Sequence, residues 1–371
     1  MTDAAVKHAP GTHPELPPPV TEVGVVGWLR KNLFSSWGNA LLTVISLYLL
    51  YLAVPPLIDW AFFSANWQAG TSRADCVEPG ACWTMVRARF GILMYGFYPV
   101  SERWRVDLAF ILQFAAMFGL LIEGVPFKKY WAIFLFVVYP FLAFFLFHGG
   151  LGLPVVETHL WGGLMLTIIV ATSGIVASLP IGVLLALGRR SKLPVIRLLS
   201  IAFIEFVRGV PLITILFMAA NVFQLFMPEG VNFDKLLRAM VGIALFSAAY
   251  LAEVVRGGLQ AIPKGQYEGA MSLGLSYWKM NALIILPQAL QISIPGIVNS
   301  FIGLMMDTTL VTTIGVLELL GQAQGAAVDP NWLGTINTAL AFISIIFFAF
   351  CFSMSRYSQF LERKLARGYR R

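Results

Sequence analysis

Charged residues are scarce in this chain. Only 12% of its 371 residues are Asp, Glu, Lys or Arg, whereas 58% are apolar and the mean hydropathy is +0.76. A soluble protein of this length could not bury so much apolar surface, so lipid must be the solvent for most of the chain. The net charge of +7 is not gathered into a basic patch with interleaved aromatic residues, which argues against nucleic-acid binding. We therefore expect an integral membrane protein.

Residue types that build catalytic and metal sites are also scarce. The chain has three cysteines and four histidines. His148 and His159 are distant in sequence from other ligand types, so no metal site is expected. No nucleophile with a nearby base stands out, which disfavours a membrane enzyme or scaffold with its own chemistry. The sequence has no Gly-x-x-x-x-Gly-Lys-Ser/Thr phosphate loop, so we expect neither ATP hydrolysis nor catalytic residues in this chain.

Long apolar runs, by contrast, are abundant. A helix of roughly 18 or more residues with few charges can cross about 30 Å of hydrocarbon. Backbone amides in lipid must be bonded within the segment, so these runs are expected to be helices rather than strands. The eight predicted spans are 39–63, 106–123, 130–150, 161–187, 198–226, 238–258, 288–316 and 335–355. They predict an all-α membrane protein with both ends of the chain on one side.

The distribution of Lys and Arg predicts the orientation. Segments on the side of the termini hold 18 of these residues, and segments on the opposite side hold 7. Because cytoplasmic segments carry the excess of positive charge, both termini are predicted to be cytoplasmic. Residues 1–23 are polar and rich in proline, without the apolar core of a signal peptide. We interpret them as the disordered start of a cytoplasmic tail that extends to residue 38.

The composition changes near residue 150. Before it, three aromatic-rich spans carry no recognisable chemistry, whereas the five later spans carry nearly every polar feature. We expect an accessory bundle at 39–150, with a periplasmic loop at about 64–105, ahead of a functional core. The loop contains Cys76 and Cys82. In an oxidising periplasm these cysteines could form a disulfide, and two free thiols are the alternative.

The polar break at 256–287 has the turn chemistry of two short helices. Pro263 can open the first helix, and Gly274 can end it by adopting the left-handed conformation. Ser276 is a good N-cap for the second helix, and Pro287 marks the return to the membrane.

This arrangement would expose Tyr267 and Glu268 on the cytoplasmic side. Such a knob could be gripped by a soluble protein and transmit force to the spans at either end. An amphipathic connector resting at the membrane interface is the alternative.

The break also matches a known pattern of Glu-x-Ala, three residues, Gly, nine residues and Ile-x-Leu-Pro. The matching residues are Glu268, Ala270, Gly274, Ile284, Leu286 and Pro287, with Gly269 in place of the usual second Ala. The pattern resembles the coupling loop of permeases in bacterial ABC importers.

Other segments of the core resemble the polar-amino-acid branch of the same family. They are 205–212, 249–258, 262–266 and 307–316. The resemblance covers about 157–365, as a five-span core with a coupling loop at 256–287. The three-span extension ahead of it is similar to that of the larger permeases of general L-amino-acid importers.

The resemblance implies a permease subunit that imports polar L-amino acids across the bacterial inner membrane by alternating access. In that family the coupling loop docks into a cleft on a cytoplasmic ATPase dimer, which binds ATP and Mg. A second permease, identical or homologous, and a periplasmic substrate-binding protein complete the assembly. The docking role carries over to Tyr267, Glu268, Ala270, Gly274 and Leu275.

Two alternatives to this reading remain. The substrate could be another small polar solute, such as an opine or an organic amine. An ion-coupled secondary transporter would instead show inverted repeats with broken helices in two halves, and no such pairing is visible in the sequence.

Four charged residues form two pairs with i, i+3 spacing. Glu205 and Arg208 can share one helix face, as can Glu253 and Arg256. Ionisable residues at membrane depth usually face a cavity or a partner, which favours a gate or substrate path. Structural pairs near the cytoplasmic interface are the alternative. Pro211 is expected to loosen the helix after the first pair.

A further polar site is predicted late in the seventh span. Asp307, Thr308 and Thr309 could meet the ammonium group of an amino acid, or Asp307 could cap the short segment leading to Ile314. Together with Tyr250 and the residues of the two charged pairs, they are the candidate substrate path.

Overall fold

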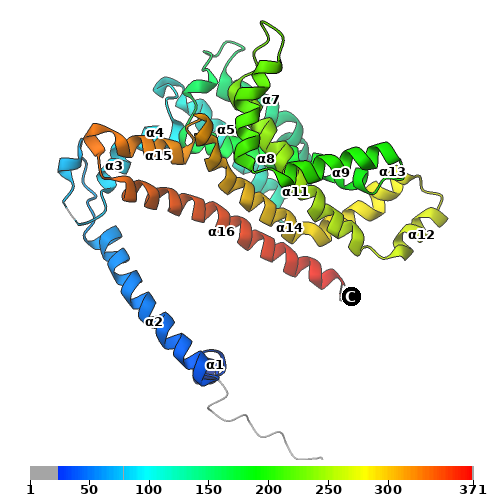
Figure 1. The fold of residues 1–371 in the computed structure, drawn as a ribbon, viewed down its shortest axis with the longest axis horizontal. Helices are drawn as coiled ribbons and strands as arrows, with labels where there is room; N and C mark the ends of the chain where they lie inside the picture. The colour runs from blue at the N-terminus through cyan, green and yellow to red at the C-terminus, as the bar shows by residue number, and fades with distance from the viewer. Residues whose placement is uncertain (1–23, 78, 370–371) are drawn as a thin grey trace, which may run out of the picture. The chain divides into compact units, whose positions relative to one another are not determined.

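The computed structural model describes residues 24–77 and 79–369, so residues 1–23 of the predicted tail lie outside the described part. The described residues form α-helices with short 3-10 and π turns, and their β structure is limited to isolated bridges. Seven helices in this part are long and apolar enough to cross a membrane, or eight if one bent pair is a single span (Figure 1). The predicted all-α class with about eight spans is confirmed.

Contacts group the chain into two compact units, the first comprising residues 1–66 and 77–81. Within it, α1 (Gly24–Asn32) shows that part of the predicted tail is helical. Ser36 then caps α2 (Trp37–Ile58) by accepting a hydrogen bond from the Asn39 amide. No residue of α2 is buried, although most of its side chains are apolar. A helix that is apolar all round is suited to lipid, as predicted for the first span.

The second unit comprises residues 67–76 and 82–371. In order, its helices of four residues or more are α3 (Trp83–Ala88), α4 (Phe90–Tyr95), α5 (Arg103–Leu121), α6 (Lys128–Ile133), the π turn Phe134–Val138, α7 (Tyr139–His148), α8 (Gly163–Arg189), α9 (Pro194–Gly209), α10 (Leu212–Phe217), the turns Met218–Val222 and Phe223–Phe226, α11 (Lys235–Ala261), α12 (Lys264–Ser272), α13 (Tyr277–Met280), the π turn Asn281–Ile285, α14 (Leu286–Asp307), the 3-10 turn Thr308–Ile314, α15 (Leu319–Val328) and α16 (Ile336–Tyr369).

Small residues hold α8 and α11 close together. A Cβ on Gly182 of α8 would lie 2.8 Å from the Leu251 Cβ and 3.0 Å from the Ala248 oxygen of α11. Ala248 and Ala252 are fully buried. Close backbone approach through small residues is a common means of packing helices in membranes, where no hydrophobic effect drives association.

The second and third predicted spans pack with the core rather than apart from it. Ala109 of α5 and Tyr139 of α7 share one buried cluster with Met165 and Ile169 of α8. Gln113 of α5 also donates a hydrogen bond to a threonine of α8 at 2.8 Å. The structure therefore places α5 to α7 in the second unit, and the accessory bundle at 39–150 stays a prediction from composition.

The predicted fifth span, 198–226, is not one straight helix. Helix α9 ends at Gly209, and the segment Leu212–Phe226 leaves at an angle of 104°. Val210 is extended (φ −109°, ψ 135°), because the following Pro211 disfavours helical backbone before it and has no N–H to donate. The proline breaks the span rather than loosening it, which corrects the prediction.

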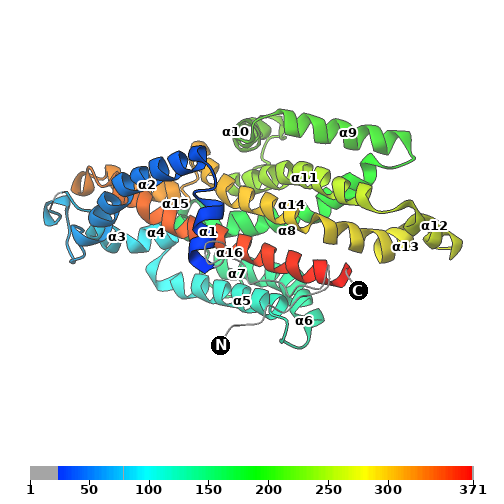
Figure 2. The same cartoon turned by 90° about the horizontal axis from the view of Figure 1, so that it is seen from below.

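Different helices lie at the two ends of the second unit. Helices α3, α4 and α15 lie together at one end, and α12 and α13 lie at the other (Figures 1 and 2). Helix α14 runs from the α13 end towards α15, and α16 returns in the opposite sense.

Candidate functional site

The polar break folds as two short helices joined by a glycine turn. Helix α12 is followed by Gly274, whose φ is +70°. A Cβ there would meet nothing within 4 Å, so the backbone conformation, rather than space, favours glycine. Ser276 occupies the N-cap position of α13, but its side chain makes no capping hydrogen bond.

Large apolar side chains are exposed on this turn beside Glu268. The side chains of Met271, Leu273 and Trp278 are 58%, 76% and 66% exposed. An exposed apolar cluster on a polar connector is typical of a docking surface. We call Glu268, Met271, Leu273 and Trp278 the docking turn. Sequence analysis identified only Glu268 of these four, although the three apolar residues in a short polar break were a visible signal.

Tyr267 was predicted to be exposed, and the structure contradicts this. The ring is half-buried, and its hydroxyl donates to the Leu259 carbonyl at 3.3 Å. The Arg190 Nη1 donates to the same hydroxyl at 3.1 Å, and the guanidinium lies over the ring at 5.6 Å. Tyr267 therefore joins α12 to α8 and α11 instead of presenting itself to solvent.

Ala270 anchors the docking turn from beneath. It is 2% exposed, in a buried cluster that includes Leu187 of α8, Val255 of α11 and Ala289 of α14. Leu275 packs against the same cluster. Movement of α12 would thus be transmitted to three spans at once.

Glu253 of α11 is the centre of a charged cluster near this end. The side chain is 15% exposed, and Arg189 Nη1 lies 2.8 Å from its Oε1. Arg256 Nη2 lies 2.6 Å and Arg208 Nη1 3.7 Å from its Oε2. The predicted pair of Glu253 with Arg256 is confirmed.

The other predicted pair is wrong. Glu205 accepts from Arg189 of α8 at 2.8 Å, and Arg208 faces Glu253 and the Tyr250 ring, 5.4 Å from its centroid. Both residues of α9 therefore bind across helices, because a partner on a neighbouring helix competes with one three residues away. The result is a network that holds α8, α9 and α11 together.

The hydroxyls of Thr308 and Thr309 bond within their own helical segment. The Thr308 hydroxyl donates to the Met305 carbonyl at 2.8 Å, and the Thr309 hydroxyl to the Met306 carbonyl at 2.9 Å. Asp307 makes no capping hydrogen bond, which corrects the capping prediction.

Glu318 is a buried carboxylate that sequence analysis missed. Its Oε1 accepts from the amides of Leu320 and Gly321 at 2.9 and 3.1 Å and from the Thr312 hydroxyl at 2.9 Å. Its Oε2 accepts from the Thr167 hydroxyl of α8 at 3.1 Å. Burial raises the pKa of Glu318, against these hydrogen bonds, which lower it. We call this group the Glu318 clasp; a glutamate immediately before the α15 run was its only sequence signal.

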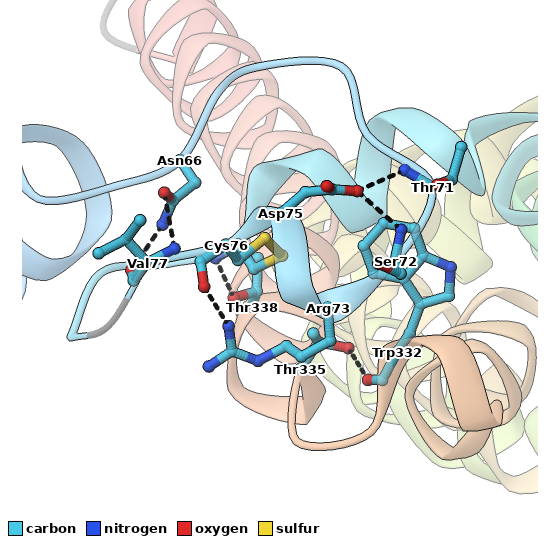
Figure 3. The surroundings of a disulfide bond; sticks show 11 residues. Asn66, Thr71, Ser72, Arg73, Asp75, Cys76, Val77, Trp332, Thr335 and Thr338 are labelled. Carbon is cyan, nitrogen blue, oxygen red and sulfur yellow. Dashed lines mark hydrogen bonds between the residues drawn. A yellow bond between two sulfur atoms is a disulfide. The ribbon is translucent and has the colours of Figure 1, made fainter.

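A disulfide joins Cys76 and Cys82, which lie in one buried cluster with Leu319 of α15 (Figure 3). Just before Cys76, the amides of Ser72 and Thr71 donate to the Asp75 carboxylate and hold the pKa of Asp75 below its usual value. The Cys82 amide donates to the Thr338 hydroxyl of α16 at 3.0 Å. Cys82 is thereby fastened to the last span.

Among the described residues, no group of three or more His, Cys, Asp or Glu side chains could hold a metal ion. The geometry instead offers an anchored docking turn, a charged cluster next to it and a buried clasp at the opposite end. These features suit a protein that moves under the action of a partner.

Comparison with known proteins identifies the family. Residues 178–367 match the model of the binding-protein-dependent transport system inner membrane component, over more than half of the chain. The chain belongs to this family. It is accordingly a multi-pass inner-membrane permease component of an ABC transporter.

Individual relatives match over different lengths. The inner membrane amino-acid ABC transporter permease protein YhdY of Escherichia coli is 51% identical over 358 residues, 96% of this chain and 97% of that protein. The glutamate/glutamine/aspartate/asparagine transport system permease protein BztC of Rhodobacter capsulatus is 40% identical, over 95% of this chain and 96% of that protein. The probable amino-acid permease protein YxeN of Bacillus subtilis is 34% identical over 207 residues, 56% of this chain and 91% of that protein. Some relatives therefore match nearly the whole chain, whereas another matches only about half of it.

Proposed function

We propose that this permease is half of the translocation path of an ATP-driven importer of polar L-amino acids. A second permease, identical or homologous, forms the other half. A cytoplasmic ATPase dimer binds ATP and Mg, and a periplasmic binding protein delivers the substrate. Both termini are cytoplasmic in this proposal, as the excess of Lys and Arg on that side favours.

The docking turn is the observation that carries the proposal. Its exposed apolar side chains offer a surface to a soluble partner, while Ala270 and Tyr267 tie α12 to the ends of α8 and α11. A partner that pulls on α12 would therefore move spans rather than a loop. The amino-acid substrate is supported by the names of the two relatives that match nearly the whole chain, both amino-acid transport permeases.

The charged cluster is proposed as the inner gate of the path. Glu205 and Arg208 are partly exposed, and both pair across helices. Arg189 lies within reach of two carboxylates, those of Glu205 and Glu253. A change in the angle between α8, α9 and α11 can therefore move Arg189 from one carboxylate to the other at little cost in free energy. Tyr250 lines the same region, under Arg208. Asp307, Thr308 and Thr309 remain candidate path residues nearer the opposite end.

Copurification tests the assembly. A tagged chain extracted in mild detergent from its native membrane should carry an ATPase and a second permease in near-equal amounts, identified by mass spectrometry. Uptake of labelled amino acids should require ATP and should compete with unlabelled glutamate or glutamine rather than with an opine or an organic amine. A chain recovered alone that moves solute without ATP would indicate a secondary transporter instead.

Gly274→Asp tests the docking turn directly. A side chain at φ +70° strains the backbone, so uptake should be abolished while the protein still inserts in the membrane. Gly265→Asp is the matched control, because Gly265 lies in α12 with open space around its Cβ position and no positive φ. Uptake at the wild-type rate in Gly274→Asp would show that the docking role is wrong.

A further inference from the structure

A pocket of about 440 Å³ opens between α8, α9 and α11, next to the charged cluster. Its lining consists of Arg189, Arg190, Arg197, Ile201, Arg256 and Gln260. Four guanidinium groups and no carboxylate line this space. Such a lining repels cations and attracts anions, whose oxygens match the fork of N–H donors on arginine.

The carboxylates around the pocket do not neutralise it. Arg189 and Arg256 share Glu253, and Arg189 also pairs with Glu205. Within the described part of the chain, the side chain of Arg190 bonds to two neutral acceptors, the Leu259 carbonyl and the Tyr267 hydroxyl.

Arg197 has no hydrogen bond or ion pair from its side chain to any described residue. The bonds of Arg190 use Nη1 alone. Two of the four guanidinium groups therefore keep donors available for a ligand.

Helix α9 carries apolar side chains on the surface next to the pocket. Val195, Ile196, Leu198 and Leu199 surround Arg197 in sequence and are 66%, 46%, 67% and 64% exposed. An apolar helix face with an arginine beside it is suited to the boundary between acyl chains and head groups. Basic pockets between spans on the cytoplasmic side are also where anionic head groups bind.

We propose that this pocket binds a phosphate group, that of an anionic phospholipid in the cytoplasmic leaflet, with Arg197 and Arg190 as its principal ligands. The proposal depends on the proposed function only for the orientation that puts this end of α8 in the cytoplasm. Because Arg190 also donates to Tyr267 of α12, the bound head group would contact an arginine that holds α12 in place.

The test measures lipid retention by the full chain purified in detergent. Phosphatidylglycerol and phosphatidylcholine are added separately, and bound lipid is counted by native mass spectrometry. The wild-type chain should retain phosphatidylglycerol at concentrations where phosphatidylcholine is lost. Arg197→Gln should weaken this retention about tenfold, equivalent to about 1.4 kcal/mol. Arg197 is exposed and unpaired, so the variant should fold normally, which its thermal midpoint checks.

Lys192→Gln is the matched control. It removes the same charge from the exposed segment between α8 and α9, outside the lining of the pocket, and should change retention less than about twofold. Arg197→Lys should lie between wild type and Arg197→Gln, because an ammonium keeps the charge but not the bidentate geometry.

Competition with inorganic phosphate shows whether the ligand is a lipid head group or free phosphate. If phosphate alone leaves lipid retention unchanged, the occupant is the lipid. If it displaces phosphatidylglycerol and raises the thermal midpoint only when Arg197 is present, the pocket binds soluble phosphate.

Two results would overturn the proposal. One is equal retention of the two lipids, or equal losses in Arg197→Gln and Lys192→Gln. The other is retention by the isolated chain but not by the chain bound to its ATPase, which would assign the arginines to an acidic surface of that partner. Because the assay needs no transport, its failure is distinct from a failure of the proposed import function.

Discussion

The two ends of the second unit each centre on one glutamate, and they satisfy it in opposite ways. Glu318 is fully buried and accepts hydrogen bonds only from neutral amides and hydroxyls. Glu253 lies among three arginines that are 20% to 35% exposed. Neutral donors in a dry site fix one arrangement, whereas several cations around one carboxylate permit exchange. The first end is built to stay assembled, and the second is built to rearrange.

The largest expected effect on stability comes from removing the Glu318 carboxylate. Glu318→Ala would leave two amides and the Thr312 hydroxyl without an acceptor, whereas the Thr167 hydroxyl keeps the Gly163 carbonyl, and buried unsatisfied groups cost about 1–3 kcal/mol each. We expect the variant to lose about 4 kcal/mol of stability or to fail to accumulate in the membrane. Glu318→Gln keeps one acceptor oxygen and should lose far less stability than Glu318→Ala. Equal thermal midpoints for Glu318→Ala and wild type would show that the clasp does not stabilise the fold.

Breaking the other end should cost less and respond to salt. Glu253→Gln leaves three arginines without their shared charge, and we expect a loss of about 2–3 kcal/mol, reduced from the value for fully buried pairs by partial exposure. Raising the salt concentration should narrow the difference in thermal midpoint between Glu253→Gln and wild type, because salt screens the interactions of exposed charges. The Glu318 variants should show no such salt dependence. The measurement is the thermal midpoint of each protein at low and high salt.

The disulfide sharpens the comparison, since Cys76 and Cys82 pack in one buried cluster with Leu319, next to Glu318 in sequence. If Cys76 and Cys82 are oxidised in the cell, Cys76→Ser should migrate more slowly on a non-reducing gel and identically to wild type on a reducing one. The expected shift is small, because only a short loop is opened. Identical mobility under both conditions would mean that the thiols are free in the cell.

The smallest expected effect concerns pH. Burial raises the pKa of Glu318 above its ordinary value of 4.5. The folded state therefore favours the protonated form, and this contribution is present below the unfolded pKa and lost as the pH rises through the folded pKa. Glu318→Gln does not titrate at this position. The thermal midpoint of wild type should fall relative to that of Glu318→Gln as the pH rises from 4.5, and a constant difference would contradict the raised pKa.

Local signals in the sequence predicted the spans and the two helices of the docking turn. Apolar length determines a span, and Gly274 determines where α12 ends, so neither depends on distant residues. Interactions between helices could not be predicted from such local signals. The partner of Glu205 lies in α8, and Thr167 is 151 residues from Glu318. Spacing along one helix favoured the pair of Glu205 with Arg208, and only the packing of three helices shows that it does not form.

The broken fifth span has a mechanical consequence. Val210 and Pro211 are both extended, and the Pro211 carbonyl accepts the first hydrogen bonds of α10 from the Thr214 and Ile215 amides, so two extended residues join α9 to α10. Turning α9 about this joint leaves the hydrogen-bond ladders of both helices intact, and the motion is resisted by the contacts of Arg189 and Arg208 and by the buried packing of Ile204 against α8 and α11. A rigid helix that turns about a hinge can transmit a small displacement, and here the hinge is two residues long.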